Sequence, residues 1–344
     1  MINLGIIGCG HWGANLVRNF SITDDCSIKY VSELSPERQK FVKEYYDEID
    51  VISDNEQLFT DDEIDAIVIA TPPSSHYKLA KESLLAGKHT FVEKPLSLKL
   101  SEAIELVNLA KDIKKVLMVG HTVIYNDSIE MVKDIINSGE IGEIYYVYAS
   151  RLNLGKVRSD VNVMWSLAPH DISVILHILG KKVLSVSAKG LSYIQDKIED
   201  VVYLNLNLEN NINVQIHLSW LDPNRRRELT IVGSKKMLVY DDTSDERIKI
   251  YDKGIDKQNQ YPYMGEYKNF GEYQLIQRAG DVVIPKVKLN EPLKKECQHF
   301  IDCITNNKEP MTSGKSALEV IRILEHAERS LYDSGKEIFL NNVL

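Results

Sequence analysis

Residues 3–13, NLGIIGCGHWG, contain the clearest structural signal in the first part of the chain. The apolar run Asn3–Ile7 predicts a short buried strand, and the segment NLVRNF (15–20) has helical spacing of its apolar side chains. The three glycines between them, Gly8, Gly10 and Gly13, have the spacing GxGxxG. A match to this spacing is weak by itself, but here it follows a strand and opens a helix, which is the context that gives it meaning.

The glycine turn predicts a dinucleotide site at the start of that helix. The first glycine permits a tight turn, the second lets the backbone approach a pyrophosphate, and the third allows the helix to pack closely on the strand. The helix N-terminus then faces the phosphates. Glu33 follows a second apolar run, Ile28–Val31, and lies 33 − 13 = 20 residues beyond Gly13. An acidic residue at that distance is expected to bond the adenosine ribose hydroxyls; the alternative is a solvated surface glutamate.

The same glutamate favours NAD over NADP, because its carboxylate would repel a 2′-phosphate. No arginine follows Glu33 at once, but Arg38 lies five residues further on and leaves tolerance of NADP open. NAD is therefore the expected cofactor.

Further strands alternate with helical patterns along this part of the chain. Strand candidates at Asp65–Ala70, Lys88–Val92 and Val116–Gly120 are separated by helical segments. This alternation predicts an α/β fold with a doubly wound parallel Rossmann sheet in residues 1–121. Ligands of such sheets bind at the carboxyl ends of the strands. The cofactor-binding residues expected there are Gly8, Gly10, His11, Trp12, Gly13, Glu33, Thr71, Pro72, His76, Glu93, Lys94 and His121.

Lys94 lies in the segment FVEKPL (91–96), between a carboxylate and a proline. It follows the strand candidate Lys88–Val92, so its ammonium group is expected where a bound dinucleotide ends. The alternative is a surface lysine paired with Glu93, which is the more common situation away from a strand end.

Residues 122–344 predict an α+β domain for substrate binding and oligomerisation. Its strand candidates are Ile144–Ser150, Val183–Lys189, Val201–Leu208, Asn213–Trp220, Glu228–Val232, Met237–Tyr240 and Arg247–Tyr251. Such a run of strands predicts a largely antiparallel open sheet, which can offer one face to a partner subunit in a homodimer or homotetramer. We also expect an extended arm or loop at 253–290 and helices at Ser128–Ser138, Glu296–Ile304 and Ser316–Leu331, the last two available to pack back on the first domain.

The segment WSLAPHDISVIL (165–176) predicts a helix that starts near Pro169 and carries His170 on its first turn. The helix dipole disfavours a cation there, so the imidazole is expected to stay neutral and able to accept a proton. A packing or capping histidine is the alternative, and the more common one for a lone helical histidine. His177 lies seven residues further on without a third ligand, so no metal site is expected.

Charge and composition exclude several classes of function. The formal charge of −9 over 344 residues, with Lys and Arg scattered among Asp and Glu, provides no basic stripe for nucleic acid. No window reaches the roughly 18 apolar residues that span a bilayer, and the start MINLGIIGCG has no signal-peptide pattern. The four cysteines contain no CxxC pair and are expected to be reduced. A cytoplasmic protein with a small-molecule partner, and no membrane partner, is expected.

Six motifs in order resemble the Gfo/Idh/MocA oxidoreductases over essentially the whole chain. They are GCGHWG (8–13), ATPPSSH (70–76), VEKP (92–95), GEIG (139–142), PHDI (169–172) and TSGK (312–315). The resemblance implies that Lys94 takes part in proton transfer or holds the reacting hydroxyl, and that His170 is the acid/base partner. Family members that act on inositol or free sugars often carry Asp four residues before and three residues after that histidine, where this chain has Ser166 and Ser173. Lys94 and His170 are therefore left as the main pair.

Three segments resemble a subgroup, the UDP-N-acetylglucosamine (or its uronic acid) 3-dehydrogenases: GHWGANLVRNF (10–20), SRLNLGKVRSDVNVMWSLAPHDIS (150–173) and SWLDPNRRRELTIVGSKKMLVYDD (219–242). Arg158 and Asn162 suit a role in gripping a diphosphate or an acidic sugar, and an ion pair of Arg158 with Asp160 is an equally weighted alternative. The substrate-binding residues expected on this basis are Lys94, Tyr125, Asn153, Arg158, Asn162, Trp165 and His170.

The resemblance thus implies NAD-dependent oxidation at C3 of a UDP-N-acetylhexosamine or its uronic acid. Two alternatives within enzymes are a ketoreductase on a deoxysugar nucleotide and a dehydrogenase of a free polyol such as inositol. An alternative of another class is a non-catalytic NAD-binding redox regulator, because a fold alone does not establish activity. A regulator would have no need for both Lys94 and His170.

Overall fold

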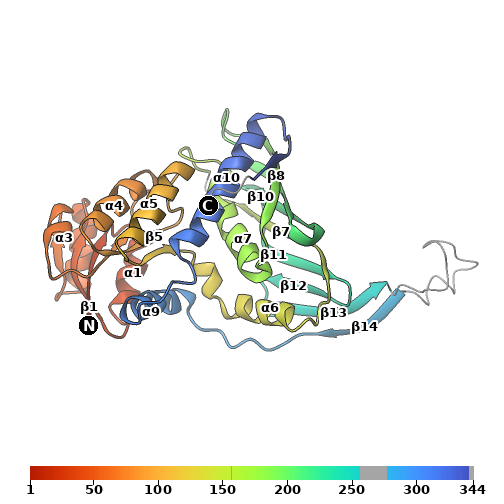
Figure 1. Ribbon diagram of the computed structural model, residues 1–344, viewed down its shortest axis with the longest axis horizontal. Coiled ribbons are helices and arrows are strands. Elements are labelled where there is room, and N and C mark those ends of the chain that lie inside the picture. The colour runs from red at the N-terminus through yellow and green to blue at the C-terminus, as the bar shows by residue number, and fades with distance from the viewer. Residues whose placement is uncertain (156, 256–276, 341–344) are drawn as a thin grey trace, which may run out of the picture. The chain divides into compact units, whose positions relative to one another are not determined.

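A computed structural model describes residues 1–155, 157–255 and 277–340, and within them the chain divides into two compact units (Figure 1). The first unit comprises Met1–Asn126 and Asn290–Glu325. The second comprises Asp127–Leu289 and His326–Leu344, as far as these are described. The first unit therefore includes a segment from late in the sequence.

The first unit is built on a six-stranded sheet in the order β3-β2-β1-β4-β5-β6. Each neighbouring pair is parallel, which confirms the predicted Rossmann sheet. The strands are β1 (Ile2–Ile7), β2 (Cys26–Ser32), β3 (Asp50–Ile52), β4 (Ala66–Ile69), β5 (His89–Glu93) and β6 (Leu117–Gly120). The strand order reverses between β1 and β4, so the carboxyl ends beside this point are where a ligand is expected.

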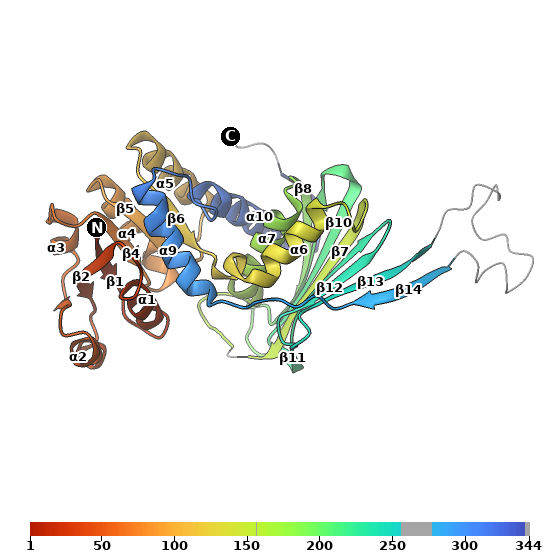
Figure 2. The same ribbon diagram turned by 90° about the horizontal axis from the view of Figure 1, so that it is seen from below.

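Helices from both ends of the sequence complete the first unit. They are α1 (Gly13–Phe20), α2 (Pro36–Tyr45), α3 (Glu56–Thr60), α4 (Pro73–Leu85), α5 (Leu100–Asp112), the short 3-10 helix η1 (Thr122–Tyr125) and α9 (Pro292–Thr305). α9 packs beside α1 (Figure 2). Phe300 of α9 meets the rings of Phe20 and Phe91 edge-on, with centroids 6.3 and 5.6 Å apart. All three rings are fully buried, so α9 belongs to the core of this unit.

The second unit contains a nine-stranded sheet in the order β14-β13-β12-β11-β7-β10-β9-β8-β15. Only the pair β7–β10 is parallel among these described strands, which confirms the predicted mostly antiparallel sheet. The strands are β7 (Ile144–Leu154), β8 (Val183–Leu191), β9 (Val201–Leu208), β10 (Ile212–Ser219), β11 (Leu221–Gly233), β12 (Met237–Asp241), β13 (Ile248–Ile255), β14 (Gln277–Val283) and β15 (Ile338–Phe339).

One face of this sheet is covered by the helices α6 (Asp127–Asn137) and α7 (Val163–Leu179) (Figure 2). The side chains of β7 follow the alternation expected of a half-buried strand. Val147 and Ala149 are buried, whereas Tyr146 and Tyr148 on the other face are 46% and 39% exposed. No described helix of this unit covers the face that carries these tyrosines (Figure 2). α10 (Gly314–Tyr332) contributes to both units.

The prediction of an extended arm or loop at 253–290 was wrong in part. Residues 253–255 continue β13, and Gln277–Val283 form β14, which pairs with it; a strand at a sheet edge needs no regular apolar pattern, because only one neighbour constrains it. Residues 256–276 lie outside the described part of the chain. No helix in the described ranges is long and apolar enough to cross a membrane.

Candidate functional site

The glycine turn between β1 and α1 has the geometry that a dinucleotide requires. Gly8 has φ of +91°, and a Cβ there would come within 2.9 Å of the Ala70 carbonyl oxygen. A Cβ on Gly13 would lie 2.2 Å from the Gly8 carbonyl oxygen. In contrast, nothing lies within 4 Å of a Cβ built on Gly10. Two glycines are thus required by packing, and the third leaves space at the N-terminus of α1 that a pyrophosphate can occupy.

Glu33 is held next to this turn at the end of β2. Its Oε2 accepts a hydrogen bond from the Cys9 backbone N–H at 2.6 Å, and its Oε1 accepts one from Ser35 N at 2.8 Å. Arg38 donates to the carbonyl oxygens of Cys9 and Gly10 at 2.6 and 2.9 Å. The carboxylate is therefore fixed where adenosine ribose hydroxyls are expected, and the arginine braces the turn. These residues fit NAD.

Glu93 links the glycine turn to the end of β5. The indole Nε1 of Trp12 donates to Glu93 Oε1 at 2.5 Å, although Trp12 as a whole is 42% exposed. A Cβ on Gly120 would lie 2.7 Å from the same carboxylate oxygen, so the carboxyl packs against the end of β6. Burial raises the pKa of Glu93 to about 7, and the Trp12 hydrogen bond and the Lys94 charge oppose that rise.

The loops after β4, β5 and β6 converge around Lys94. His76 has its two ring nitrogens against the carbonyl oxygens of Pro95 and Thr71, at 2.7 and 2.8 Å, so it joins two of these loops. Burial, together with the Lys94 charge, lowers the pKa of His121 to about 3. The same two causes lower the pKa of His76, where the carbonyl contacts oppose them. The positive charge of Lys94 thus acts to lower the pKa of three buried side chains, Glu93, His76 and His121.

Most predicted cofactor-binding residues of the first unit therefore lie on one set of strand ends. His11 lies in the glycine turn and is exposed, and its carbonyl oxygen accepts a 3.2 Å hydrogen bond from Asn15 Nδ2. Pro72 is the N-cap of α4. The binding role of each residue stays a prediction.

Glu296 of α9 is a buried acid that the sequence reasoning missed. It is fully buried, and its Oε2 accepts a 2.6 Å hydrogen bond from the Thr122 hydroxyl. Its Oε1 has no hydrogen-bond partner among the described residues. Burial and the nearby Glu93 raise the pKa of Glu296 well above its usual value. The available signal was its spacing with Leu293 and Phe300, which puts a carboxyl on the apolar stripe of α9.

His170 is not on the first turn of its helix, as the sequence analysis predicted. α7 begins at Val163, and Asn162 caps it by accepting a 3.1 Å hydrogen bond from Trp165 N. Pro169 lies inside the helix, which makes His170 residue 170 − 162 = 8 of α7. The prediction was wrong because it treated the proline as the start signal and overlooked the Asn cap seven residues earlier. The helix-dipole argument for a neutral His170 therefore no longer applies.

The other predicted substrate residues have contacts of their own. Arg158 donates from Nε to Asp160 at 2.9 Å and forms a second contact through Nη2, as in the alternative considered for it. Asn162 donates to Glu199 at 2.8 Å. The Trp165 Nε1 donates to Glu328 at 2.9 Å. The buried hydroxyl of Tyr125 lies 3.2 Å from Thr312 Oγ1. Asn153 is half-buried on β7. Their roles with substrate stay predictions.

Comparison with known proteins covers both units. Residues 2–121 match the family described as "Oxidoreductase family, NAD-binding Rossmann fold", and residues 129–239 match the "GFO/IDH/MocA C-terminal domain". The chain is 21% identical to the myo-inositol 2-dehydrogenase of Thermotoga maritima over 100% of both chains. It is 33% identical to the UDP-N-acetylglucosamine 3-dehydrogenase of Acidithiobacillus ferrooxidans, over 39% of this chain and 42% of that one.

Solved structures share the fold over nearly the whole chain. The UDP-N-acetylglucosamine 3-dehydrogenase GnnA from Acidithiobacillus ferrooxidans has a TM-score of 0.80 over 97% of this chain and 98% of its own, at 21% identity. An oxidoreductase from Agrobacterium radiobacter in complex with NAD+, L-tartaric acid and magnesium has a TM-score of 0.79 over 98% of each chain, at 20% identity. The fold is therefore one in which NAD has been observed bound.

Proposed function

The chain belongs to the Gfo/Idh/MocA family of NAD-binding oxidoreductases, and we propose that it oxidises a hydroxyl of a sugar to a ketone with NAD. The observation that carries the proposal is Lys94, a cation placed at the end of β5 among the buried groups Glu93, His76 and His121. A fixed cation beside a dinucleotide site suits a reaction in which an oxygen becomes negatively charged.

The proton chemistry is assigned to two side chains. An imidazole nitrogen of His170 takes the proton of the reacting hydroxyl, and Lys94 Nζ stabilises the negative charge that develops on that oxygen. NAD, when bound, supplies the acceptor for the hydride that leaves the same carbon. One hydroxyl and NAD+ thus give one ketone, NADH and a proton.

The proposed substrate is a UDP-N-acetylhexosamine or its uronic acid, oxidised at C3. The similarity to the Acidithiobacillus UDP-N-acetylglucosamine 3-dehydrogenase, 33% over 39% of this chain, supports this choice. A free polyol such as inositol is the second candidate, supported by the myo-inositol 2-dehydrogenase that is 21% identical over the whole chain. A ketoreductase would run the same chemistry in reverse.

A substrate screen with NAD tests the proposal. UDP-N-acetylglucosamine, its uronic acid and myo-inositol are incubated with NAD, the absorbance of NADH is followed, and the new ketone is located by NMR. Lys94→Ala and His170→Ala should each lower kcat by at least about 100-fold, while the Kd of NADH changes little. Because the two residues act on one transition state, the double variant should fall short of the product of the single losses. Near-normal kcat in both single variants would contradict the mechanism.

We also propose that the chain forms a homodimer or homotetramer through the uncovered face of the second unit's sheet. This face carries Tyr146, Tyr148 and Tyr203, which are 46%, 39% and 48% exposed. The Tyr203 ring stacks on His217 of the neighbouring strand, with centroids 4.5 Å apart. Tyrosine is enriched in protein–protein interfaces, and a broad sheet face repeated by symmetry suits an isologous contact.

A further inference from the structure

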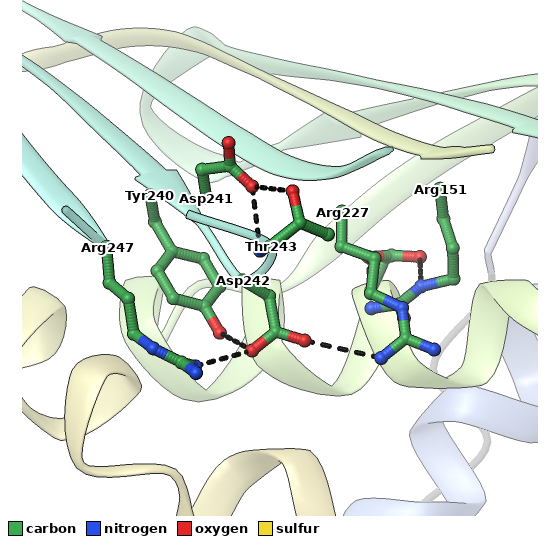
Figure 3. Close-up of polar contacts among 8 residues, drawn as sticks. Arg151, Arg227, Tyr240, Asp241, Asp242, Thr243 and Arg247 are labelled. Atoms are coloured by element: carbon green, nitrogen blue, oxygen red, sulfur yellow. Dashed lines mark hydrogen bonds and ion pairs between the residues drawn. The ribbon is translucent and has the colours of Figure 1, made fainter. Parts of the chain in front are cut away.

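The covered face of the sheet in the second unit carries a cluster of arginines outside the residues considered so far (Figure 3). β7 and β11 are antiparallel, and their register puts Arg151 opposite Arg227. Two residues along, Ala149 lies opposite Leu229, and both are buried. Because side chains alternate along a strand, the two arginines point to the face that α7 covers. Like charges directly opposite each other are destabilising, so this pair needs compensation.

The compensation is unequal. Asp171 of α7 accepts hydrogen bonds from both Nε and Nη2 of Arg151, at 2.7 and 3.0 Å. Arg227 donates only from Nη1, to Asp242 at 3.3 Å, and its Nε and Nη2 have no hydrogen-bond partner among the described residues. Asp242 is also shared, because it accepts a 2.9 Å hydrogen bond from Arg247.

The cluster therefore has an excess of positive charge at Arg227. Within the described ranges, three guanidinium groups pair with two carboxylates, which leaves 3 − 2 = +1. Asp241 does not change this balance, since its carboxylate turns away toward Thr243 (Figure 3). Desolvation lowers the pKa of Arg227, and so do the charges of Arg151 and Arg225. The Arg227 side chain is still 38% exposed, so an anion in solution can reach it.

The open edge of Arg227 has the shape of an oxyanion site. Nε and Nη2 form the side of a guanidinium that binds two oxygens of one carboxylate or phosphate. In Arg158, by contrast, Nε and Nη2 both donate hydrogen bonds to the Asp160 carboxylate. Asp171, which anchors Arg151, directly follows His170 in α7. The cluster is thus connected to the helix turn that carries the proposed acid/base residue.

On the basis of the proposed function, we infer that Arg227, supported by Arg151 and Arg247, binds an oxyanion of the substrate. The group is a phosphate of a nucleotide sugar or the carboxylate of a uronic acid. Arg158, to which the sequence analysis assigned the binding of a diphosphate or acidic sugar, is the alternative residue for the same role. The inference concerns binding, so it can be tested separately from turnover.

Calorimetry on the full-length protein saturated with NADH tests it, with UDP as the diphosphate probe and glucuronate as the carboxylate probe. Arg227→Gln should raise the Kd of one probe by at least about tenfold, the loss expected for a charged two-point contact. Arg227→Lys keeps the charge without the two-donor edge and should fall in between. The matched control is Arg226→Gln, which removes the same charge from an exposed residue on the opposite face of β11 and should leave both Kd values near wild type.

The probe that responds identifies the source of the oxyanion. Removing Arg227 also relieves its repulsion with Arg151, so the melting temperature of Arg227→Gln should not fall, and a folding defect would be visible as such. Unchanged Kd values in Arg227→Gln, no binding of either probe to wild type, or a loss seen in Arg158→Gln instead would overturn the inference. If wild type oxidises UDP-N-acetylglucosamine while Arg227→Gln binds both UDP and glucuronate normally, this inference fails and the proposed function stands. If no sugar is oxidised but Arg227→Gln loses binding of UDP or of glucuronate, the anion site is supported and the proposed function fails.

Discussion

Glu33 carries the choice between the two nicotinamide dinucleotides at the scale of a single side chain. Its carboxylate accepts two backbone N–H groups, from Cys9 and Ser35, so it is held in place rather than free to swing away from a 2′-phosphate. Arg38 does not offset it directly, because its Nε and Nη2 donate to carbonyl oxygens of the glycine turn. The structure thus gives a reason why the later arginine need not confer binding of NADP.

We expect wild type to bind NADH more tightly than NADPH, and Glu33→Gln to narrow that difference. The amide keeps an acceptor oxygen for one of the two neighbouring N–H groups and removes the charge that opposes the phosphate. The ratio of the two Kd values should fall by about tenfold, which corresponds to roughly 1.4 kcal/mol. Fluorescence titration with each reduced cofactor measures it. Equal Kd values for the two cofactors in wild type would remove the argument.

Glu93 makes stability depend on pH. Its pKa is raised from 4.5 to about 7 in the folded protein, so between these values the folded state holds a proton that the unfolded state has released. The free energy of unfolding must therefore fall as the pH rises through this window. Glu93→Gln removes this contribution while keeping an acceptor for Trp12 Nε1. The free energy of unfolding of the variant, minus that of wild type, should therefore increase from about pH 5 to about pH 8. The increase should be up to roughly 3 kcal/mol.

Thermal or urea unfolding of both proteins at the two pH values measures this gain. Glu296→Gln should act in the same direction, since burial and Glu93 also raise the pKa of Glu296. A stability difference between Glu93→Gln and wild type that is the same at both pH values would show that the carboxyl of Glu93 is ionised throughout.

At the scale of elements, the N-terminus of α7 fixes the helix that presents His170. Asn162 accepts from Trp165 N and donates to Glu199, so it caps the helix and ties it to the segment before β9. Asn162→Ala should lower the free energy of unfolding by about 1 kcal/mol, the usual cost of a lost cap. Asn162→Ser keeps a capping oxygen and should recover most of it. Urea unfolding compares the variants.

Kinetics separate this role from substrate binding by Asn162. If the residue only caps the helix, Asn162→Ser should have a near-normal KM. A KM that rises in the serine variant while its stability is retained would assign the side chain to substrate instead.

The elements that the sequence predicted well are those with a buried periodic pattern. β1, β4 and β5 were placed within one or two residues, because parallel strands covered on both faces are continuous apolar runs. No element was predicted for residues 36–60, where α2, β3 and α3 lie. α2 buries only Val42 and β3 has three residues, so neither has a pattern that sequence alone can detect.

The sequence predicted the part of the candidate site in which a motif defines the backbone geometry. It did not predict the residues that reach the site from segments far away in the sequence. Gly13 is required by a clash with Gly8 within the turn itself, and Gly8 is required by its positive φ and its close approach to Ala70 after β4. Glu296, in contrast, lies 296 − 93 = 203 residues from Glu93 in the sequence, and only the folding of α9 into the first unit brings the two acids together. Arg227 likewise depends on the register of β11 against β7.

At the scale of the whole molecule, the uncovered sheet face determines the expected assembly. Wild type should have a solution mass of two or four chains of 39.2 kDa. Tyr203→Glu should shift the mass toward the single chain, because a carboxylate at the centre of an interface would be buried without a partner. The matched control is Tyr45→Glu, which places the same charge at a 70% exposed tyrosine of α2 in the first unit. Light scattering after gel filtration measures the mass of each protein. If wild type has the mass of one chain, or if Tyr203→Glu retains the wild-type mass, this sheet face is not the subunit interface.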